Sequence, residues 1–428
     1  MNRILFRVAA LLLVAACILT GCAGKQSSTP SGTGTEPSSP HSEPVRNETT
    51  KVPAGETETE AASSADPAEI NALKASLDPI AGQYGAVGVQ AAIIRNGEVY
   101  ACYEYGYADK GAGREVTKST KYRCASLSKL AVAMTAAVLA DEGILGWDDD
   151  VGDLLGCPVR SPSYPDVAVT PRMLLTHTSS VIDSGAFLDS RNSGSSAQLS
   201  SLLSSGGVYS GAKPGSVFSY SNFGVALLAA AIEKKTGVPF QALAKEKLFG
   251  PLGMDAAFLA SDLKDKSSLA PLYSGGSVSY GIDRQLAEKA CETLGQTHHL
   301  YQGNLTVSAA DYAKLIVTLL NDGVYGGRRV LSHESVAEIT GAQFDTGLVS
   351  EGVQGFGECQ LRNLIGGRTM HCHTGSNFGM YACFAFDPAD KSGVVILTSG
   401  ANAAMNYDSG VYNIHTDMIR AIYKTTLG

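Results

Sequence analysis

Residues 122–129, Tyr122-Arg123-Cys124-Ala125-Ser126-Leu127-Ser128-Lys129, form the stretch that decides the fold. Its last four residues read S-x-x-K, and apolar residues continue to Glu142 before Gly143. This pattern predicts a helix over residues 126–142 that ends at the glycine. Because residues three apart share a helix face, Lys129 would reach the hydroxyl of Ser126. A lysine whose pKa is lowered can take the proton of a serine, so the segment predicts a nucleophile.

Taken alone, S-x-x-K is a weak signal. Ser261-Asp262-Leu263-Lys264 has the same spacing, but it lies in a polar stretch, and we interpret it as a chance match. The second motif, Tyr220-Ser221-Asn222, precedes a predicted helix over residues 222–235. A phenol there can carry a proton, and an asparagine amide can orient a lysine and a substrate. The alternative is a turn tyrosine followed by an asparagine that caps the helix.

The third motif, His373-Thr374-Gly375, ends a predicted strand near the C-terminus. A glycine allows close approach of another backbone, and the next N–H, on Ser376, can stabilise an oxyanion together with the N–H of Ser126. The alternative is a strand that ends in a turn and carries a half-buried histidine.

The order of the three motifs resembles that of the serine β-lactamase and penicillin-binding protein superfamily. The forms with Tyr220 and His373 resemble the class C β-lactamase-related branch, which includes D-alanyl-D-alanine carboxypeptidases, esterases and some peptidases. Residues 174–179, 213–222, 251–254 and 385–388 are also similar to that family, and the resemblance extends from about residue 67 to the C-terminus.

The resemblance implies a cell-envelope serine hydrolase that works through an acyl-enzyme, without a cofactor or metal. Ser126, Lys129 and Tyr220 would be catalytic. The substrate-binding residues would be Asn222, His373, Thr374, Gly375 and Ser376. His373 would add either positive charge or a hydrogen bond near the carboxylate of the substrate. A D-alanyl-D-alanine carboxypeptidase or a β-lactamase is expected, acting on a peptidoglycan stem peptide or a β-lactam. An esterase, or a non-catalytic receptor for penicillin or peptidoglycan, is the alternative.

Three residues depart from the family pattern, in which glycine is usual at each position. They are Ser180, Cys372 and Ser376. None of them replaces a catalytic group, so they leave the expected chemistry in place and put the substrate in question.

Strand patterns occur early and late in the chain, with helices between them. Residues 87–94 and 98–105 flank Asn96-Gly97, a strong hairpin signal, and late strands are expected over residues 356–361, 368–374, 381–386 and 394–398. Helices are expected over residues 69–84, 308–321 and 412–427. This order predicts an α/β (α+β) fold with an antiparallel sheet of about five strands, flanked by terminal helices. An all-helical subdomain would be inserted at about residues 144–344, and the resemblance implies a β-lactamase/transpeptidase-like architecture.

The cysteines and histidines near the third motif leave two questions open. Hairpin symmetry would place Cys372 opposite either Cys359 or Cys383, and free thiols are expected rather than a disulfide. His371 and His373 would share one strand face, but no third ligand has suitable spacing, so no metal site is expected. Elsewhere in the chain, His298 and His299 are expected at a loop surface, and His177 is expected to be a structural residue at a helix end.

The N-terminal part of the chain has the composition of a secreted, tethered protein. Two arginines precede an apolar run over residues 8–19, and Leu19-Thr20-Gly21-Cys22 resembles the lipobox of bacterial lipoproteins. We therefore expect residues 1–22 to be a signal peptide and Cys22 to be lipidated. Residues 23–66, rich in Ser, Thr, Pro and Glu, would be a disordered tether. The hydrolase domain, residues 67–428, would be anchored outside the bacterial membrane.

The overall charge argues against one class of partner. Lys and Arg total 33 against 41 for Asp and Glu, a net charge of −8. Since nucleic-acid binding needs a basic face, we expect no nucleic-acid partner.

Overall fold

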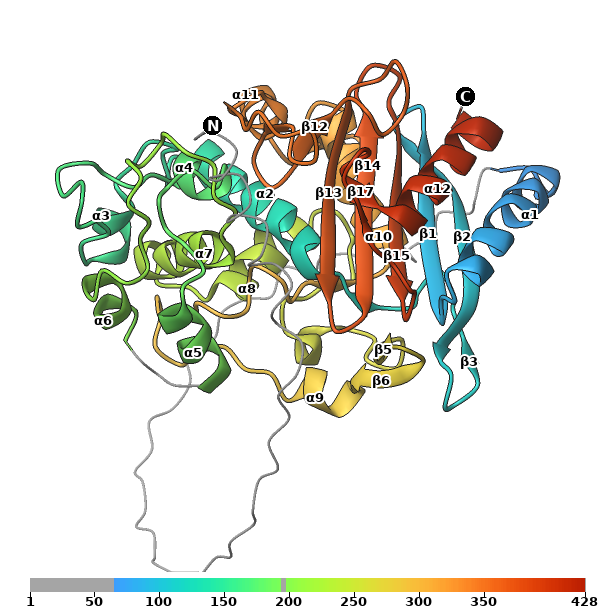
Figure 1. The fold of residues 1–428 in the computed structure, drawn as a ribbon, viewed down its shortest axis with the longest axis horizontal. Coiled ribbons are helices and arrows are strands. Elements are labelled where there is room, and N and C mark those ends of the chain that lie inside the picture. Colours follow the sequence, from blue (N-terminus) through green and yellow to red (C-terminus); the bar gives the residue numbers. More distant parts are fainter. Residues whose placement is uncertain (1–64, 194–197, 428) are drawn as a thin grey trace, which may run out of the picture. The chain divides into compact units, whose positions relative to one another are not determined.

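An antiparallel sheet lies at the centre of the fold, with the strand order β10-β11-β12-β13-β14-β15-β1-β2-β3 (Figure 1). The computed structural model describes residues 65–193 and 198–427, so the predictions for the signal peptide, for Cys22 and for most of the tether lie outside the described residues. The five long strands are β1 (Gly88–Arg95), β2 (Glu98–Asp109), β13 (Met370–Asn377), β14 (Met380–Asp387) and β15 (Ser392–Ser399). The predicted sheet built from both ends of the chain is therefore confirmed.

Short strands extend this sheet at both edges. They are β3 (Arg114–Glu115), β10 (Phe344–Asp345), β11 (Val353–Gln354) and β12 (Cys359–Leu361). The sequence predicted β12 as a longer strand, but it pairs with β13 only from Met370 to Cys372. Among the residues that the structure describes, no strand pairs with the rest of β13, from His373 onward, on the β12 side.

Two-residue turns fix the register of the long hairpins. Asn96 and Gly97 have φ angles of 56° and 76°, as a type I′ turn requires, and Arg95 pairs with Glu98. Phe378 and Gly379 form the corresponding turn between β13 and β14, with φ angles of 52° and 72°. The first turn was predicted from its sequence, whereas a phenylalanine at positive φ gives no such signal.

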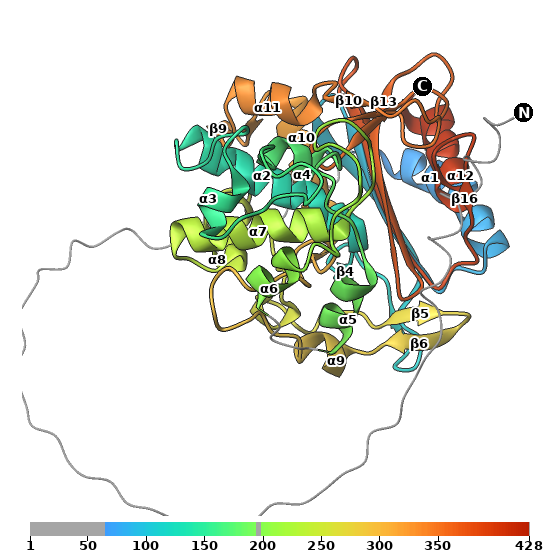
Figure 2. The same ribbon diagram turned by 60° about the vertical axis from the view of Figure 1, so that its left-hand side comes forward.

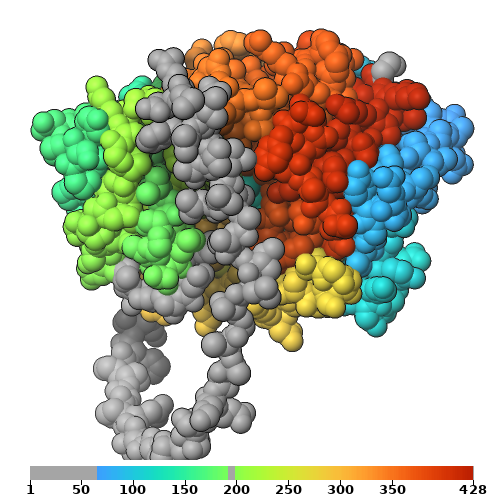
Figure 3. Space-filling model, viewed as in Figure 1, coloured from blue at the N-terminus to red at the C-terminus, as the bar shows by residue number. Residues whose placement is uncertain are grey.

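Helices cover both faces of the sheet (Figure 2). One face packs against α1 (Pro67–Gln83) and α12 (Asn413–Ile422), and the first and last segments of the described fold adjoin on the surface (Figure 3). The other face packs against α10 (Ala309–Leu320), and the same core extends to α2 (Ser128–Asp141) and α7 (Asn222–Thr236), which pack against each other. Side chains alternate accordingly: Ile93 and Ile396 belong to the first core, and Ile94 and Leu397 to the second.

The middle of the chain, residues 144–344, holds helices joined by loops, but it is not all-helical as expected. Gly275-Gly276 and Gly326-Gly327, all at positive φ, turn the chain into short hairpins there. The further helices of the chain are α3 (Val151–Leu155), α4 (Pro171–Leu175), α5 (Gly185–Ser193), α6 (Leu199–Ser204), α8 (Phe240–Ala244), α9 (Ile282–Leu286) and α11 (His333–Thr340). The small pairs are β4 (Tyr122–Arg123) with β7 (Thr306–Val307), β5 (Leu272–Ser274) with β6 (Ser277–Tyr280), β8 (Val324–Tyr325) with β9 (Arg328–Arg329), and β16 (Met405–Asn406) with β17 (Val411–Tyr412). Among the described residues, no helix combines the length and apolar character needed to cross a bilayer.

Candidate active site

The residue predicted as the nucleophile lies in a strained turn just before α2. Ser126 belongs to a 3-10 turn, Ala125–Leu127, and Ala125 has a φ angle of 50°. Such a conformation is costly for a residue with a side chain and persists only where the surroundings hold it. The Cys124 N–H donates to the carbonyl oxygen of Leu305 at 2.8 Å, and the Leu305 N–H donates to Ser128 Oγ at 2.9 Å. The loop before β7 therefore fixes the position of Ser126.

Lys129 is buried and lies one turn beyond Ser126, as the spacing predicted. Its Nζ is 3.0 Å from Ser126 Oγ, 2.8 Å from Asn222 Oδ1 and 3.0 Å from the carbonyl oxygen of Gln302. Burial lowers the pKa of Lys129 to about 7, although Asp183 raises it. A substantial part of Lys129 is therefore neutral at pH 7 and able to accept a proton. The second S-x-x-K pattern has no such geometry, because Leu263 is extended and Lys264 is exposed.

The ring of Tyr220 lies close to the amino group of Lys129. Lys129 Nζ is 5.0 Å from the centroid of the Tyr220 ring. The centroids of the Tyr220 and His177 rings are 4.3 Å apart. Desolvation raises the pKa of Tyr220, while its interaction with the Ser126 side chain acts in the opposite direction. Tyr220 is consequently a neutral phenol at pH 7, and it is 37% exposed, so it can meet a substrate.

Asn222 is the first residue of α7, and Ser221 is the residue that caps this helix, by accepting from the Gly224 N–H at 2.9 Å. The alternative that Asn222 is the cap is therefore wrong. The side chain of Asn222 instead joins Lys129 to Asp183, whose Oδ2 accepts from Asn222 Nδ2 at 2.7 Å. Sequence reasoning missed Asp183 because it lies in a loop far from α7 along the chain.

Strand β13 brings the third motif beside Ser126. A Cβ atom on Gly375 would lie 2.7 Å from the carbonyl oxygen of Cys124 and 2.9 Å from the Ser126 nitrogen, so only glycine fits there. Asn377 and Met380 flank the two-residue turn and form a hydrogen-bonded pair. Because hydrogen-bonded and non-hydrogen-bonded pairs alternate along an antiparallel ladder, the next residue, Ser376, points its N–H away from β14. That N–H therefore points toward the open edge of β13.

His373 is neutral at physiological pH. Burial, together with the charge of Lys129, lowers the pKa of His373 to about 4, and its Nδ1 lies 2.6 Å from the carbonyl oxygen of Thr374. The sequence left open whether this residue supplies positive charge or a hydrogen bond to the substrate. The local environment favours the hydrogen bond.

Two further aromatic residues border the site, and neither was singled out as a substrate contact. Tyr412, on β17, interacts through its side chain with Ser376. His177 was predicted to be structural, and its Nδ1 accepts from the Ser221 N–H at 3.2 Å, which helps to hold the Tyr220 segment. Desolvation lowers the pKa of His177 well below its usual value, so it is neutral.

The departures from the family pattern have separate surroundings. Cys372 pairs directly with Cys359 across β12 and β13, with 3.8 Å between the sulfur atoms, and both are free thiols. Cys383 lies opposite Thr374, so the expectation that it is equally well placed to face Cys372 is wrong. The reason is the Phe378-Gly379 turn, which sets the register. Ser180 is buried, and its φ angle is 65°. A glycine, which is usual at this position in the family, adopts such a positive φ without strain.

Two histidine predictions outside the main motifs can also be compared with the structure. His371 is held by Glu358, with Nδ1 3.0 Å from Oε2. Within residues 65–193 and 198–427, no three His, Cys, Asp or Glu side chains are grouped so as to hold a metal ion. His298 was expected at the surface, but it is buried against Ser190, with 2.9 Å from Nε2 to Oγ.

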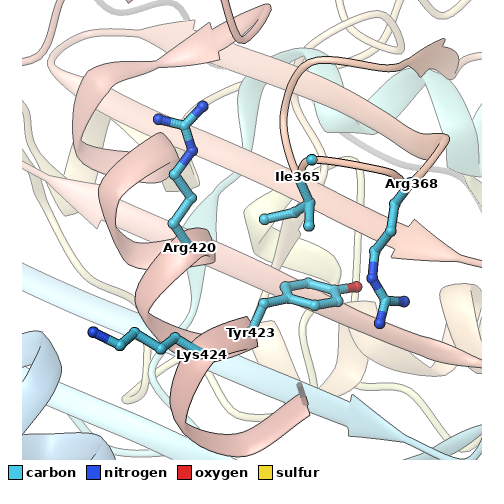
Figure 4. A pocket seen from close by; sticks show the side chains of 6 residues that line it. Ile365, Arg368, Arg420, Tyr423 and Lys424 are labelled. Atoms are coloured by element: carbon cyan, nitrogen blue, oxygen red, sulfur yellow. The ribbon is translucent and has the colours of Figure 1, made fainter.

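A separate pocket of about 350 Å³ lies on the α12 side of the sheet (Figure 4). It is lined by Ile365, Gly366, Arg368, Arg420, Tyr423 and Lys424. Arg368 is already paired with Asp387 at 2.8 Å and with Asp390, so its charge is balanced within the protein. None of these residues contacts the Ser126 site, and the pocket is distinct from it.

Comparison with known proteins agrees with this arrangement. Residues 71–415 match the model of the family described as Beta-lactamase. Penicillin-binding protein 4* of Bacillus subtilis (strain 168) is 32% identical over 201 residues, which cover 45% of this chain and 43% of that protein. Esterase EstB of Burkholderia gladioli is 32% identical over 208 residues, covering 44% of this chain and 52% of that protein. The matched parts thus span less than two thirds of either relative.

The fold itself has counterparts among solved structures. A class C beta lactamase from Rhodobacter sphaeroides superposes with a TM-score of 0.64 at 18% identity. The superposition covers 84% of this chain and 100% of that chain. The expected β-lactamase/transpeptidase-like architecture is therefore confirmed.

Proposed function

Because the chain belongs to the Beta-lactamase family, we propose that it is a serine hydrolase that forms a covalent acyl-enzyme on Ser126. The observation that carries this proposal is the contact of 3.0 Å between Lys129 Nζ and Ser126 Oγ. Lys129, with a pKa of about 7, supplies the base that a serine nucleophile needs.

In the proposed first step, Ser126 Oγ attacks a substrate carbonyl carbon and its proton passes to the Lys129 and Tyr220 pair. The backbone N–H groups of Ser126 and Ser376 stabilise the oxyanion. The bond to the leaving group then breaks as Tyr220 gives that group a proton, and Tyr220 regains one from Lys129. In the second step, water attacks the acyl carbonyl and gives a proton to Tyr220, which passes its own phenolic proton to neutral Lys129. The bond to Ser126 Oγ then breaks, and Lys129 returns the proton to Ser126 Oγ.

The substrate-binding residues of the proposal surround this centre. Asn222 orients Lys129 and the substrate, and His373 and Thr374 contact the substrate beside the open edge of β13. Gly375 keeps that edge close to Ser126.

The preferred substrate class is a D-alanyl-D-alanine stem peptide, with β-lactams as the close alternative. Both reactions begin with the same acylation and differ in how fast water removes the acyl group. One curated relative is named a penicillin-binding protein and one structural neighbour a class C beta lactamase. These names support the proposal without separating the two activities.

An esterase of the same fold is the second candidate. It is favoured by the neutral state of His373, which offers a substrate carboxylate a hydrogen bond but no positive charge. An uncharged ester has no need of such a charge. The relative EstB is named an esterase.

We also propose that the enzyme is anchored outside the bacterial membrane through lipid on Cys22. The support is the sequence pattern of the signal peptide and lipobox alone. Intact mass of the protein from a membrane fraction tests this. A mature chain that begins at Cys22 with added acyl mass is expected, and unmodified protein in the medium would refute it.

The activity is tested by following the intact mass of the full chain after mixing with a penicillin, while hydrolysis of the drug is measured in parallel. A persistent adduct on Ser126 indicates a penicillin-binding carboxypeptidase or a receptor. Rapid drug loss without a lasting adduct indicates a β-lactamase. If neither occurs but p-nitrophenyl acetate is hydrolysed, the esterase is favoured.

The Ser126→Ala variant is the control for each of these outcomes. It should lose both adduct and turnover while the fold is retained. Turnover near that of the wild type in this variant would refute the proposed nucleophile.

A further inference from the structure

The carboxylate of Asp183 contacts three consecutive residues at the start of α7. Its Oδ1 accepts from the Phe223 N–H at 2.8 Å and from Ser221 Oγ at 3.2 Å. Its Oδ2 accepts from Asn222 Nδ2 at 2.7 Å. One side chain therefore ties the loop before α5 to the residue that contacts Lys129.

These contacts fix which way the Asn222 amide faces. A carboxylate accepts hydrogen bonds and donates none, so the NH2 group of Asn222 must face Asp183. The amide oxygen is then left to face Lys129, at 2.8 Å from Nζ. A flipped amide would bring two oxygens together at Asp183 and two donors together at Lys129.

The orientation of Asn222 matters for the lone pair of Lys129. A neutral amine has two N–H groups and one lone pair. The amide oxygen of Asn222 and the carbonyl oxygen of Gln302 can each take one N–H, at 2.8 and 3.0 Å. The third direction, toward Ser126 Oγ at 3.0 Å, is then left for the lone pair.

We propose that Asp183 is a positioning residue for the acylation of Ser126: by holding the amide of Asn222, it directs the lone pair of neutral Lys129 at the serine hydroxyl. This inference rests on the proposed function and adds a residue to it. Asp183 does not contact the reacting atoms and acts through Asn222.

Asp183 also acts on Lys129 through its charge. Its carboxylate raises the pKa of Lys129, against the larger effect of burial, and the thiol of Cys124 acts in the same direction as Asp183. The other groups that face Lys129 are the neutral rings of His177 and His373 and the phenol of Tyr220. The acid limb of the acylation rate is the pH range in which the rate rises as Lys129 loses its proton. Removing the charge of Asp183 should therefore move this acid limb to lower pH.

The test compares Asp183→Asn with the reciprocal double variant Asp183→Asn/Asn222→Asp in the full chain. The probe is a fluorophosphonate, which phosphonylates an activated serine with loss of fluoride, and the rate is measured against pH. Asp183→Asn places an amide beside Asn222. The NH2 group of Asn222 is then no longer held toward position 183 and can turn to face Lys129. We expect at least a tenfold loss of rate at the optimum and an acid limb at lower pH than in the wild type.

The double variant exchanges the two groups and restores the hydrogen bonds between them. The new amide at position 183 can accept from the Phe223 N–H and donate to the new carboxylate at position 222, which then accepts from Lys129. We expect much of the rate to return, with the acid limb above that of the wild type, because the charge now contacts the lysine. A structural role alone would not move the limb in opposite directions in the two variants.

A matched control addresses the start of the helix. Ser221→Ala removes the cap of α7 and leaves Asp183 and Asn222 in place, so it should lower the melting temperature without moving the acid limb. Rates and limbs equal to the wild type in both Asp183 variants would overturn the inference and leave the proposed function standing. If Asp183→Asn fails to fold, the double variant decides, and a limb unchanged there overturns the inference. A wild-type chain that never reacts would overturn both.

Discussion

A Cβ atom on Gly375 would lie 2.9 Å from the backbone nitrogen of Ser126. A residue other than glycine at position 375 would therefore force strand β13 away from the turn that holds Ser126. The two N–H groups proposed to bind the oxyanion belong to these two segments.

Gly375→Ala should therefore separate the oxyanion donors while leaving the remainder of the site intact. Loss of one such donor costs about 10²–10³ in rate, so a decrease of that size is expected in the acylation of Ser126. Stopped-flow or timed mass measurements with the fluorophosphonate check this. Gly366→Ala is the matched control, because a Cβ atom there meets no other atom within 4 Å. Equal rates in the two variants would contradict the prediction.

How far the site could be predicted from the sequence depends on how local each relationship is. Ser126 and Lys129 are one helical turn apart, and Asn96-Gly97 defines its own turn, so both were within reach of sequence patterns. Asp183 was not, because its link to Asn222 exists only after the loop before α5 has packed against α7. Hairpin symmetry correctly offered Cys359 as the partner of Cys372, but the register of β13 against β14 was missed. That register depends on the turn at Phe378, whose positive φ has no signal in the sequence.

The rate of Ser126 acylation should rise with pH through about 7 and then level off. Lys129 has a pKa of about 7, and only its neutral form can accept the serine proton. The fluorophosphonate reaction measured between pH 5 and 9 checks this, with Lys129→Met as the inactive control. An acid limb near pH 10, the ordinary range of a lysine, would show that Lys129 is charged in the resting site.

The same lysine predicts a dependence of stability on pH. The pKa of Lys129 is about 7 in the folded chain against 10.5 for an unperturbed lysine. Between these values the unfolded chain binds more protons than the folded chain, so the free energy of unfolding rises with pH in this window. Urea unfolding at pH 7 and pH 9.5 should show a larger increase in the wild type than in Lys129→Met. A difference between the two pH values that is the same in both proteins would contradict this.

His373 should show no titration between pH 5 and 8. Its pKa is about 4, because burial and the nearby Lys129 both oppose protonation. The ring resonances of His373, assigned by comparison with His373→Gln, can be followed by NMR over this range. His373→Gln keeps an uncharged hydrogen-bonding group and should retain most of the acylation rate. A titration midpoint near 6.5 would instead indicate a charged histidine that binds the substrate carboxylate.

Oxidation of the folded chain should join Cys359 to Cys372 and leave Cys383 reduced. The first two thiols face each other across paired strands at 3.8 Å, whereas Cys383 lies opposite Thr374 and its sulfur is 3.4 Å from the carbonyl oxygen of Phe384. Diamide accepts the two electrons and two protons released when the disulfide forms.

A non-reducing peptide map after diamide treatment identifies the linked pair. The cross-link closes a short loop, so it should stabilise the chain by up to about 3 kcal/mol in thermal or urea unfolding. Cys383→Ser should form the link as the wild type does, and Cys359→Ser should not form it. A peptide that links Cys372 to Cys383 would mean that β13 and β14 pair in a different register, and with it the position of Ser376 beside Ser126 would have to be revised.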